Sequence, residues 1–119
     1  MNYSAKKIYV TCGRKEVGEW AAYMRAHAGE VRQSLCQELV RHEAWYLGED
    51  KDGLYLIGVM DVDDQRASAA IAATSSLSID QVHREFKRYW DRARVTRLNI
   101  PADQIPTFDT CKVLLDVRP

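Results

Sequence analysis

Two strand-like segments near the middle of the chain, residues 41–49 and 54–62, are apolar on both faces. Between them, Asp50-Lys51-Asp52-Gly53 predicts a hairpin turn that ends in a left-handed glycine. Side chains alternate between the faces of a strand, so a sheet with one face in water normally alternates apolar and polar residues. If Asp50 pairs with Leu54, Tyr46 covers Gly58. One face of the hairpin then carries Trp45, Leu47, Tyr55, Ile57 and Val59. The opposite face carries Ala44, Tyr46, Leu54, Leu56 and Met60.

Both apolar faces of the predicted sheet must be buried against other protein. Helices of the same chain can bury one face, and exposing the other would leave several hundred Å² of apolar surface, more than monomers usually expose. A second copy of the chain, packed sheet to sheet about a twofold axis, would bury it, so we expect a homodimer. The alternative is that the C-terminal segment folds back over the sheet.

The order of the remaining predicted elements indicates the fold class. Periodicity and capping signals predict the strands 6–12 and 111–117 and the helices 16–39, 63–74 and 78–93, with a loop over 95–110. Gly29 weakens the middle of the first helix and allows a bend there. Strand, helix, hairpin, helix is the split β-α-β pattern of a ferredoxin-like α+β sandwich with an antiparallel sheet. Right-handed crossovers would place the first and third strands side by side and the second at the edge. We expect a single domain over residues 1–119, with a core at about 6–93 and a C-terminal extension at 94–119.

Composition excludes several classes of protein. Seventeen Lys+Arg balance seventeen Asp+Glu, which disfavours a general polyanion binder. No apolar run reaches the length of a membrane helix, and residues 1–10 lack the apolar stretch of a signal peptide. Cys12, Cys36 and Cys111 form no C-x-x-C pair, so we expect reduced thiols and a cytoplasmic protein. No His or Cys spacing is typical of a metal site, and we expect no metal and no cofactor.

Two short motifs carry a resemblance. Glu19-Trp20 with Met24, and Ile79-Asp80-x-x-His83-x-x-Phe86, resemble a small bacterial family of unknown function, although Ser78 stands where that family has proline. The arrangement over about residues 6–93 also resembles the dimeric α/β-barrel group of ferredoxin-like proteins, which includes antibiotic-biosynthesis-type monooxygenases. The resemblance implies that fold and a dimeric barrel. It transfers no catalytic residue, because the narrower family has no established chemistry.

His83 and Asp80 are the candidate catalytic residues. They lie three residues apart and can share a helix face, which suits a proton-transferring histidine oriented by a carboxylate. The alternative is that Asp80 stabilises the helix start and His83 is a packing residue. Tyr9, Trp45, Tyr55 and Trp90 are the candidate ligand-binding residues, because small-molecule pockets are often lined by aromatic rings. The same rings could instead fill a dimer core.

A ridge of Arg84, Arg88 and Arg92 on the last helix could contact nucleic acid, but a neutral chain makes a solvated helix face the better interpretation. The sequence therefore predicts a homodimeric domain that binds or converts a small molecule in an aromatic pocket. The alternative is a structural or regulatory interaction module with no catalytic site. Whether the chain is an enzyme stays open.

Overall fold

The computed structural model describes residues 1–119 and shows an α+β fold with a five-stranded antiparallel sheet and four helices. The strands lie in the order β4-β1-β3-β2-β5. None of the helices has the length and hydropathy needed to span a lipid bilayer. In chain order, the elements are β1 (Tyr3–Val10), α1 (Arg14–Ala26), α2 (Ala28–Gln37), β2 (His42–Asp50), β3 (Gly53–Asp61), α3 (Gln65–Thr74), α4 (Ser78–Phe86), the 3-10 turn η1 (Lys87–Tyr89), β4 (Trp90–Arg97) and β5 (Lys112–Val117).

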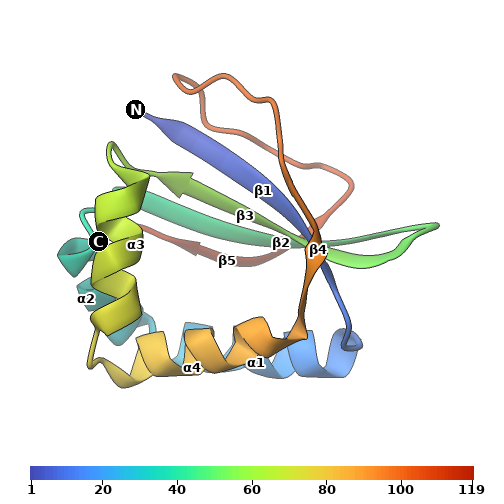
Figure 1. Ribbon diagram of the computed structural model, residues 1–119, viewed down its shortest axis with the longest axis horizontal. Helices are drawn as coiled ribbons and strands as arrows, with labels where there is room; N and C mark the ends of the chain where they lie inside the picture. Colours follow the sequence, from blue (N-terminus) through green and yellow to red (C-terminus); the bar gives the residue numbers. More distant parts are fainter.

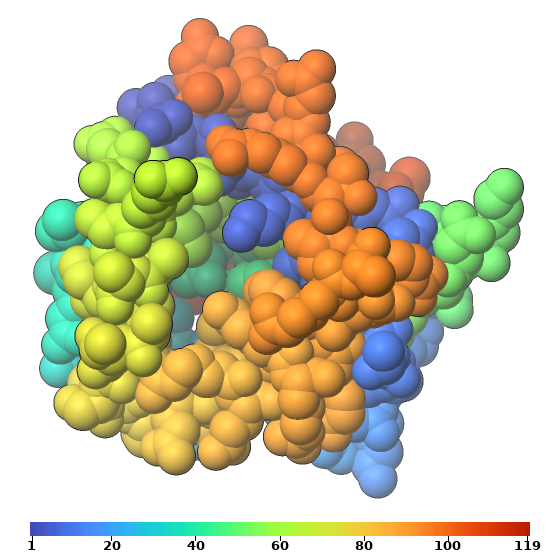
Figure 2. Space-filling view, viewed as in Figure 1, coloured from blue at the N-terminus to red at the C-terminus, as the bar shows by residue number.

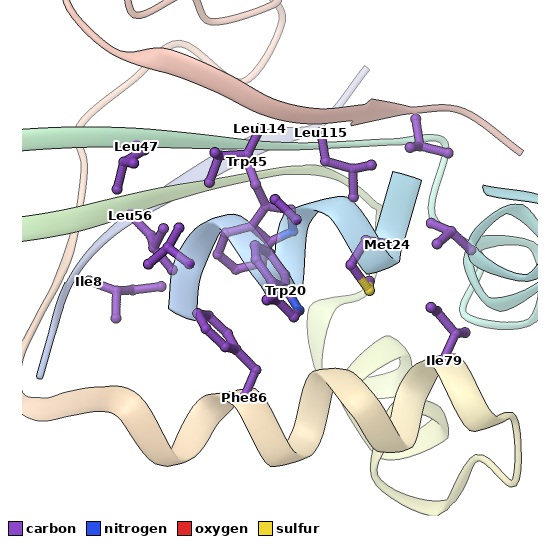
Figure 3. Close-up of a cluster of buried hydrophobic side chains, with 14 of the residues drawn as sticks. Ile8, Trp20, Met24, Trp45, Leu47, Leu56, Ile79, Phe86, Leu114 and Leu115 are labelled. Carbon is purple, nitrogen blue, oxygen red and sulfur yellow. The ribbon is translucent and has the colours of Figure 1, made fainter. Parts of the chain in front are cut away.

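The helices and the long β4–β5 connection lie on opposite sides of the sheet (Figure 1). Between the sheet and the helices lies a core of 19 buried residues, in which Ile8, Leu35 and Leu56 are almost fully buried. Figure 3 shows Trp20 of α1 in this core, between Trp45 of the sheet and Phe86 of α4. The first and third strands pair side by side, as predicted. The second strand is not at the edge, because β5 pairs with it.

The predicted helix 16–39 is two helices. The backbone leaves helical geometry at His27, where φ is −113° and ψ is 36°, two residues before the weakening Gly29. α1 and α2 then bury different residues, Trp20 and Met24 on the first, Val31 and Leu35 on the second. The break lets α2 leave the direction of α1 and form one wall of the cavity described below.

The prediction of a helix over 78–93 is wrong beyond Phe86. The chain forms a single 3-10 turn and then β4, which pairs with β1 from Lys6 to Val10. Tertiary pairing explains the change: without β4, one backbone edge of β1 would lack hydrogen-bond partners. The predicted final strand 111–117 is confirmed as β5.

The hairpin forms as predicted, but its register differs by one residue. Asp50 pairs with Gly53 rather than Leu54, so the loop holds two residues, and Gly53 takes the left-handed φ of 130°. A one-residue slip exchanges the faces of one strand relative to the other. The helix side therefore combines Trp45 and Leu47 with Leu54, Leu56 and Met60, and the other side combines Ala44 and Tyr46 with Tyr55, Ile57 and Val59. Trp45, not Tyr46, covers Gly58.

The chain itself covers the second apolar face. Tyr3, Ala5, Ala44, Tyr46, Ile57 and Val59 form a separate buried cluster there. Leu98, Ile100, Phe108 and Cys111 of the β4–β5 connection pack on this cluster, and the rings of Tyr46 and Phe108 lie 5.2 Å apart. Backbone hydrogen bonds from Leu98 N to Ala5 O and from Tyr3 N to Ala102 O hold the segment against β1. A sheet-to-sheet dimer through this face would have to displace residues 98–111, and the homodimer stays a prediction.

Candidate functional site

A cavity of about 190 Å³ lies between the sheet and helices α2, α3 and α4. Figure 2 shows the hollow framed by α3, α4 and the start of β4. Its volume equals that of about six water molecules in the liquid. Two chemically distinct walls face it: one carries carboxylates and a lysine, and the other carries aromatic rings.

Two glutamates form the acidic wall. Glu38 ends α2 and is 8 % exposed, with its Oε2 3.4 Å from the Oγ of Ser34. Burial, together with Glu43 and Asp80, raises the pKa of Glu38 to about 7. Glu43 comes from β2, where its Oε1 accepts a hydrogen bond of 2.9 Å from Trp45 Nε1. Burial also raises the pKa of Glu43, because the charged carboxylate loses hydration.

Asp80 lies in the first turn of α4 and contributes a third carboxylate. Its two oxygens accept hydrogen bonds of 2.5 Å from Ser34 Oγ and from Ser75 Oγ. Asp80 therefore joins α2 to the loop before α4. Glu30 adds a second link between these helices, since its carboxylate accepts from the Ser78 hydroxyl and the Ile79 amide. These contacts fix the position of α4 against the cavity.

Two lysines line the cavity, the exposed Lys6 of β1 and the half-buried Lys87, which lies directly after α4. Lys87 forms no salt bridge, and its Nζ lies 5.0 Å from the centroid of the Trp90 ring. Burial lowers the pKa of Lys87, and the nearby charges of Lys6 and Arg92 lower it further. Glu43 and Glu38 act in the opposite direction. Burial thus outweighs the acidic neighbours.

The aromatic wall surrounds His83. Its ring centroid lies 5.5 Å from Trp45, 5.6 Å from Trp20 and 6.3 Å from Trp90. Burial, with help from Lys87 and Arg84, lowers the pKa of His83 to about 3, so the imidazole is neutral at pH 7. His83 Nδ1, Trp20 Nε1 and Trp90 Nε1 are buried without a hydrogen-bond partner. Buried polar atoms without a hydrogen-bond partner are rare in folded proteins, because each one lowers the stability of the fold.

This arrangement suits proton exchange with a bound molecule. Acids whose pKa values are raised and a base whose pKa is lowered line the same cavity, and such opposed shifts are typical of functional sites. No group of three or more His, Cys, Asp or Glu side chains is arranged to hold a metal ion. The side chains that line the cavity supply carboxyl, amine, imidazole and indole groups.

A family model of unknown function, DUF6176, matches residues 1–106. The chain belongs to this family. The expectation that it resembles a family of unknown function is therefore confirmed. Comparisons with curated proteins and with solved structures give no match. DUF6176 assigns no role to any residue, but the structure explains part of the motif that carried the resemblance. Trp20, Met24, Ile79 and Phe86 belong to the main core.

In this DUF6176 protein, four of the six predicted site residues line the cavity: Asp80, His83, Trp45 and Trp90. Asp80 does not bind His83, because its oxygens are hydrogen-bonded to serines. The structure places the other two, Tyr9 and Tyr55, on the opposite face of the sheet. Their ring centroids lie 5.8 Å apart, and Lys7 Nζ lies over both rings.

The predicted arginine ridge is not continuous, because the helix ends before it is complete. Arg84 of α4 donates hydrogen bonds to the carbonyl oxygens of Ala72, at the end of α3, and of Ser75, in the loop that follows. These bonds hold α4 against the end of α3. Arg88 follows the helix and donates to the Tyr89 hydroxyl, whereas Arg92 lies on β4. Arg84 therefore has a structural role in this DUF6176 fold.

Sequence reasoning missed Glu38, Glu43 and Lys87. A signal existed for Glu43, which alternates with Trp45 and Leu47 and so points to the helix side of the sheet. A charged residue on a buried strand face is a strong sign of function or of pairing. No comparable signal marked Glu38 or Lys87, because the sequence places both in predicted helices, where charged side chains usually face solvent.

Proposed function

We propose that this protein binds a small molecule in the cavity and exchanges protons with it. The observation that carries the proposal is the meeting of the buried Glu38, the half-buried Glu43 and the half-buried base Lys87 around one hollow. Acids and bases whose pKa values approach the working pH are efficient proton donors and acceptors.

Each side chain has a proposed role. Glu38, Glu43 and Lys87 exchange protons, Trp45 and Trp90 form the apolar wall, and Asp80 positions α4. His83 was predicted to transfer protons. A neutral imidazole at pH 7 favours a hydrogen-bonding role instead.

The size of the cavity limits its ligand. At about 190 Å³ it is smaller than the roughly 300–1,000 Å³ of sites for drug-sized molecules. A metabolite of a few carbon atoms with an apolar part and at least one polar group fits these walls best. The interaction-module alternative would require no ligand at all.

We also infer a ferredoxin-like arrangement, supported by the order β4-β1-β3-β2 and by helices between β1 and β2 and between β3 and β4. A cytoplasmic homodimer remains part of the proposal. With the second sheet face covered by residues 98–111, its contacts would fall elsewhere, and the exposed edge strand β5 with Val113 is one such surface. Sedimentation at micromolar concentration distinguishes the dimer from a 13.6 kDa monomer.

Native mass spectrometry of the protein purified without denaturation tests ligand binding. We expect a bound small molecule in the wild type and its loss in Ala72→Phe, because Ala72 lines the cavity. Ala73→Phe is the matched control, since Ala73 is exposed on the same helix and does not line the cavity. Equal ligand content in both variants would contradict the proposal.

A further inference from the structure

Lys87 differs from the other lysines of the chain in its surroundings. Lys7 donates a hydrogen bond of 3.0 Å to Asp50, and Lys15 lies 4.0 Å from Glu19. Lys6, Lys51 and Lys112 are exposed. Lys87 is half-buried, lines the cavity and has no carboxylate in salt-bridge contact.

We propose that Lys87 Nζ forms an imine with the carbonyl carbon of a small aldehyde or ketone bound in this cavity. The inference rests on the proposed ligand-binding function and names the chemical class of the ligand. An amine is a nucleophile only when it is unprotonated, and withdrawal from water and from acidic partners favours that form. The centroid of the Trp90 ring lies 5.0 Å from Nζ, so the amine and the ring border the same part of the cavity.

Charged groups from four other elements surround the amine. Lys6 of β1 and Arg92 of β4 repel a second positive charge, whereas Glu43 of β2 and Glu38 of α2 attract it. The burial that lowers the pKa of Lys87 raises the pKa of both glutamates. Burial thus disfavours the ammonium form of Lys87 and the carboxylate forms of Glu38 and Glu43, and imine formation uses a neutral amine and a proton donor.

The step balances in atoms and electrons. The lone pair of Lys87 Nζ attacks the carbonyl carbon, and the carbonyl oxygen takes a proton from Glu38 or Glu43. The nitrogen then returns a proton to that carboxylate, the hydroxyl group takes this proton and leaves as water, and the iminium nitrogen gives its last hydrogen back to the carboxylate. The two hydrogens of the amine thus leave with the carbonyl oxygen as one water, and no oxidant or reductant is consumed.

Reductive trapping of the full-length protein tests this inference. Propanal and pyruvate serve as the neutral and anionic probes, each with sodium cyanoborohydride at pH 7, and peptide mapping locates the adducts. We expect Lys87 to react several-fold faster than the exposed Lys15 and Lys51, because its lowered pKa leaves more of the amine unprotonated and the cavity holds the probe beside it. Equal rates at these lysines would overturn the inference.

The cavity variants test whether trapping at Lys87 requires the probe to bind in the cavity or reflects only a reactive amine. Trapping at Lys87 should fall at least about tenfold in Ala72→Phe and persist in Ala73→Phe, because a filled cavity excludes the probe. Ala69→Phe, at another lining position, replaces Ala72→Phe if that variant does not fold. Undiminished trapping in a folded cavity-filled variant would also overturn the inference.

Lys87→Arg distinguishes this inference from the proposed function. Arginine keeps the positive charge but forms no imine under these conditions. If wild-type Lys87 is not trapped and Lys87→Arg still carries the small molecule found by native mass spectrometry, the imine is refuted and ligand binding stands. If Ala72→Phe and Ala73→Phe hold equal amounts of that molecule, the proposed function fails as well.

Discussion

Burial shifts the acids and the bases of the cavity in opposite directions, because it disfavours whichever form of each group is charged. The pKa of Glu38 rises to about 7, and that of His83 falls to about 3. Their effects on stability therefore have opposite dependence on pH. Variants of Glu38 and of His83 therefore measure the two effects separately.

Replacing Glu38 by Gln should stabilise the protein at high pH. The pKa of the carboxyl rises from 4.5 in the unfolded chain to about 7, so the folded state binds more protons, and stability falls as pH rises through that window. Glutamine carries no charge, and Glu38→Gln should gain roughly 1–3 kcal/mol over the wild type at pH 8 and little at pH 4.5. Urea unfolding at both pH values measures this. The exposed Glu85→Gln is the control, and a gain independent of pH would contradict the explanation.

Replacing His83 by Gln should protect the protein against acid. A histidine whose pKa falls from 6.5 to about 3 on folding binds fewer protons in the folded state, so stability is lost as pH falls below 6.5. Between pH 7 and pH 4, His83→Gln should lose about 2–3 kcal/mol less than the wild type. Urea unfolding over this range measures the difference. Identical pH slopes in the two proteins would show that His83 is not buried as a neutral ring.

At the scale of elements, the order and type of most helices and strands followed from the sequence, but their junctions did not. Apolar spacing predicts a helix over α1 and α2 without the break at His27, and the turn at Asp50–Gly53 locates β2 and β3, because these signals are local. The end of α4 at Phe86 is set by pairing of β4 with β1, far away in sequence. The spacing of Val82, Phe86 and Tyr89 is helical and does not indicate that a strand begins at residue 90.

The candidate site was partly predictable for the same reason. His83, Asp80, Trp45 and Trp90 stand out by residue type, and the structure brings them to one cavity. Tyr55 looked equivalent, but strand register decides which face a side chain takes, and the hairpin register differs by one residue from the prediction. Tyr9 alternates with Ile8 and Val10, which face the helices, so its ring lies on the other face. Two-residue and three-residue turns compete closely in a sequence such as Asp-Lys-Asp-Gly.

The pairing of Trp45 with Gly58 across the hairpin gives a prediction at this scale. A Cβ at position 58 would lie 2.8 Å from the Trp45 ring, so Gly58→Ala forces the ring or the strand to move. We expect a loss of about 1–3 kcal/mol in the free energy of unfolding, measured in urea. Gly18→Ala is the control: it meets open space in α1 and should gain up to about 1 kcal/mol. Equal effects of the two substitutions would contradict the contact.

For the whole molecule, the decisive feature is the segment that covers the second sheet face. Both apolar faces were recognised in the sequence, and the fold-back of the C-terminal region was one of two covers considered. The structure shows residues 98–111 in that position, held by Leu98, Ile100 and Phe108. The sequence could not separate the two covers, because a loop with two prolines carries no periodicity that links it to a sheet.

Loosening this cover should expose the sheet. Phe108→Asp places a charge against the Tyr46 ring and should cost about 1–3 kcal/mol, with faster proteolysis within residues 98–111 and self-association in sedimentation. Ile105→Asp is the control, because Ile105 is 51 % exposed. Unchanged proteolysis and sedimentation of Phe108→Asp would show that the segment is not the cover.

All three tryptophans of the chain gather at one place: Trp45 and Trp90 line the cavity, and Trp20 lies 5.6 Å from Trp45. The tryptophan fluorescence of the protein therefore comes entirely from this neighbourhood. A molecule that binds in the cavity changes the polarity around the indole rings and quenches or shifts their emission. Tryptophan fluorescence therefore reports ligand binding without an added dye.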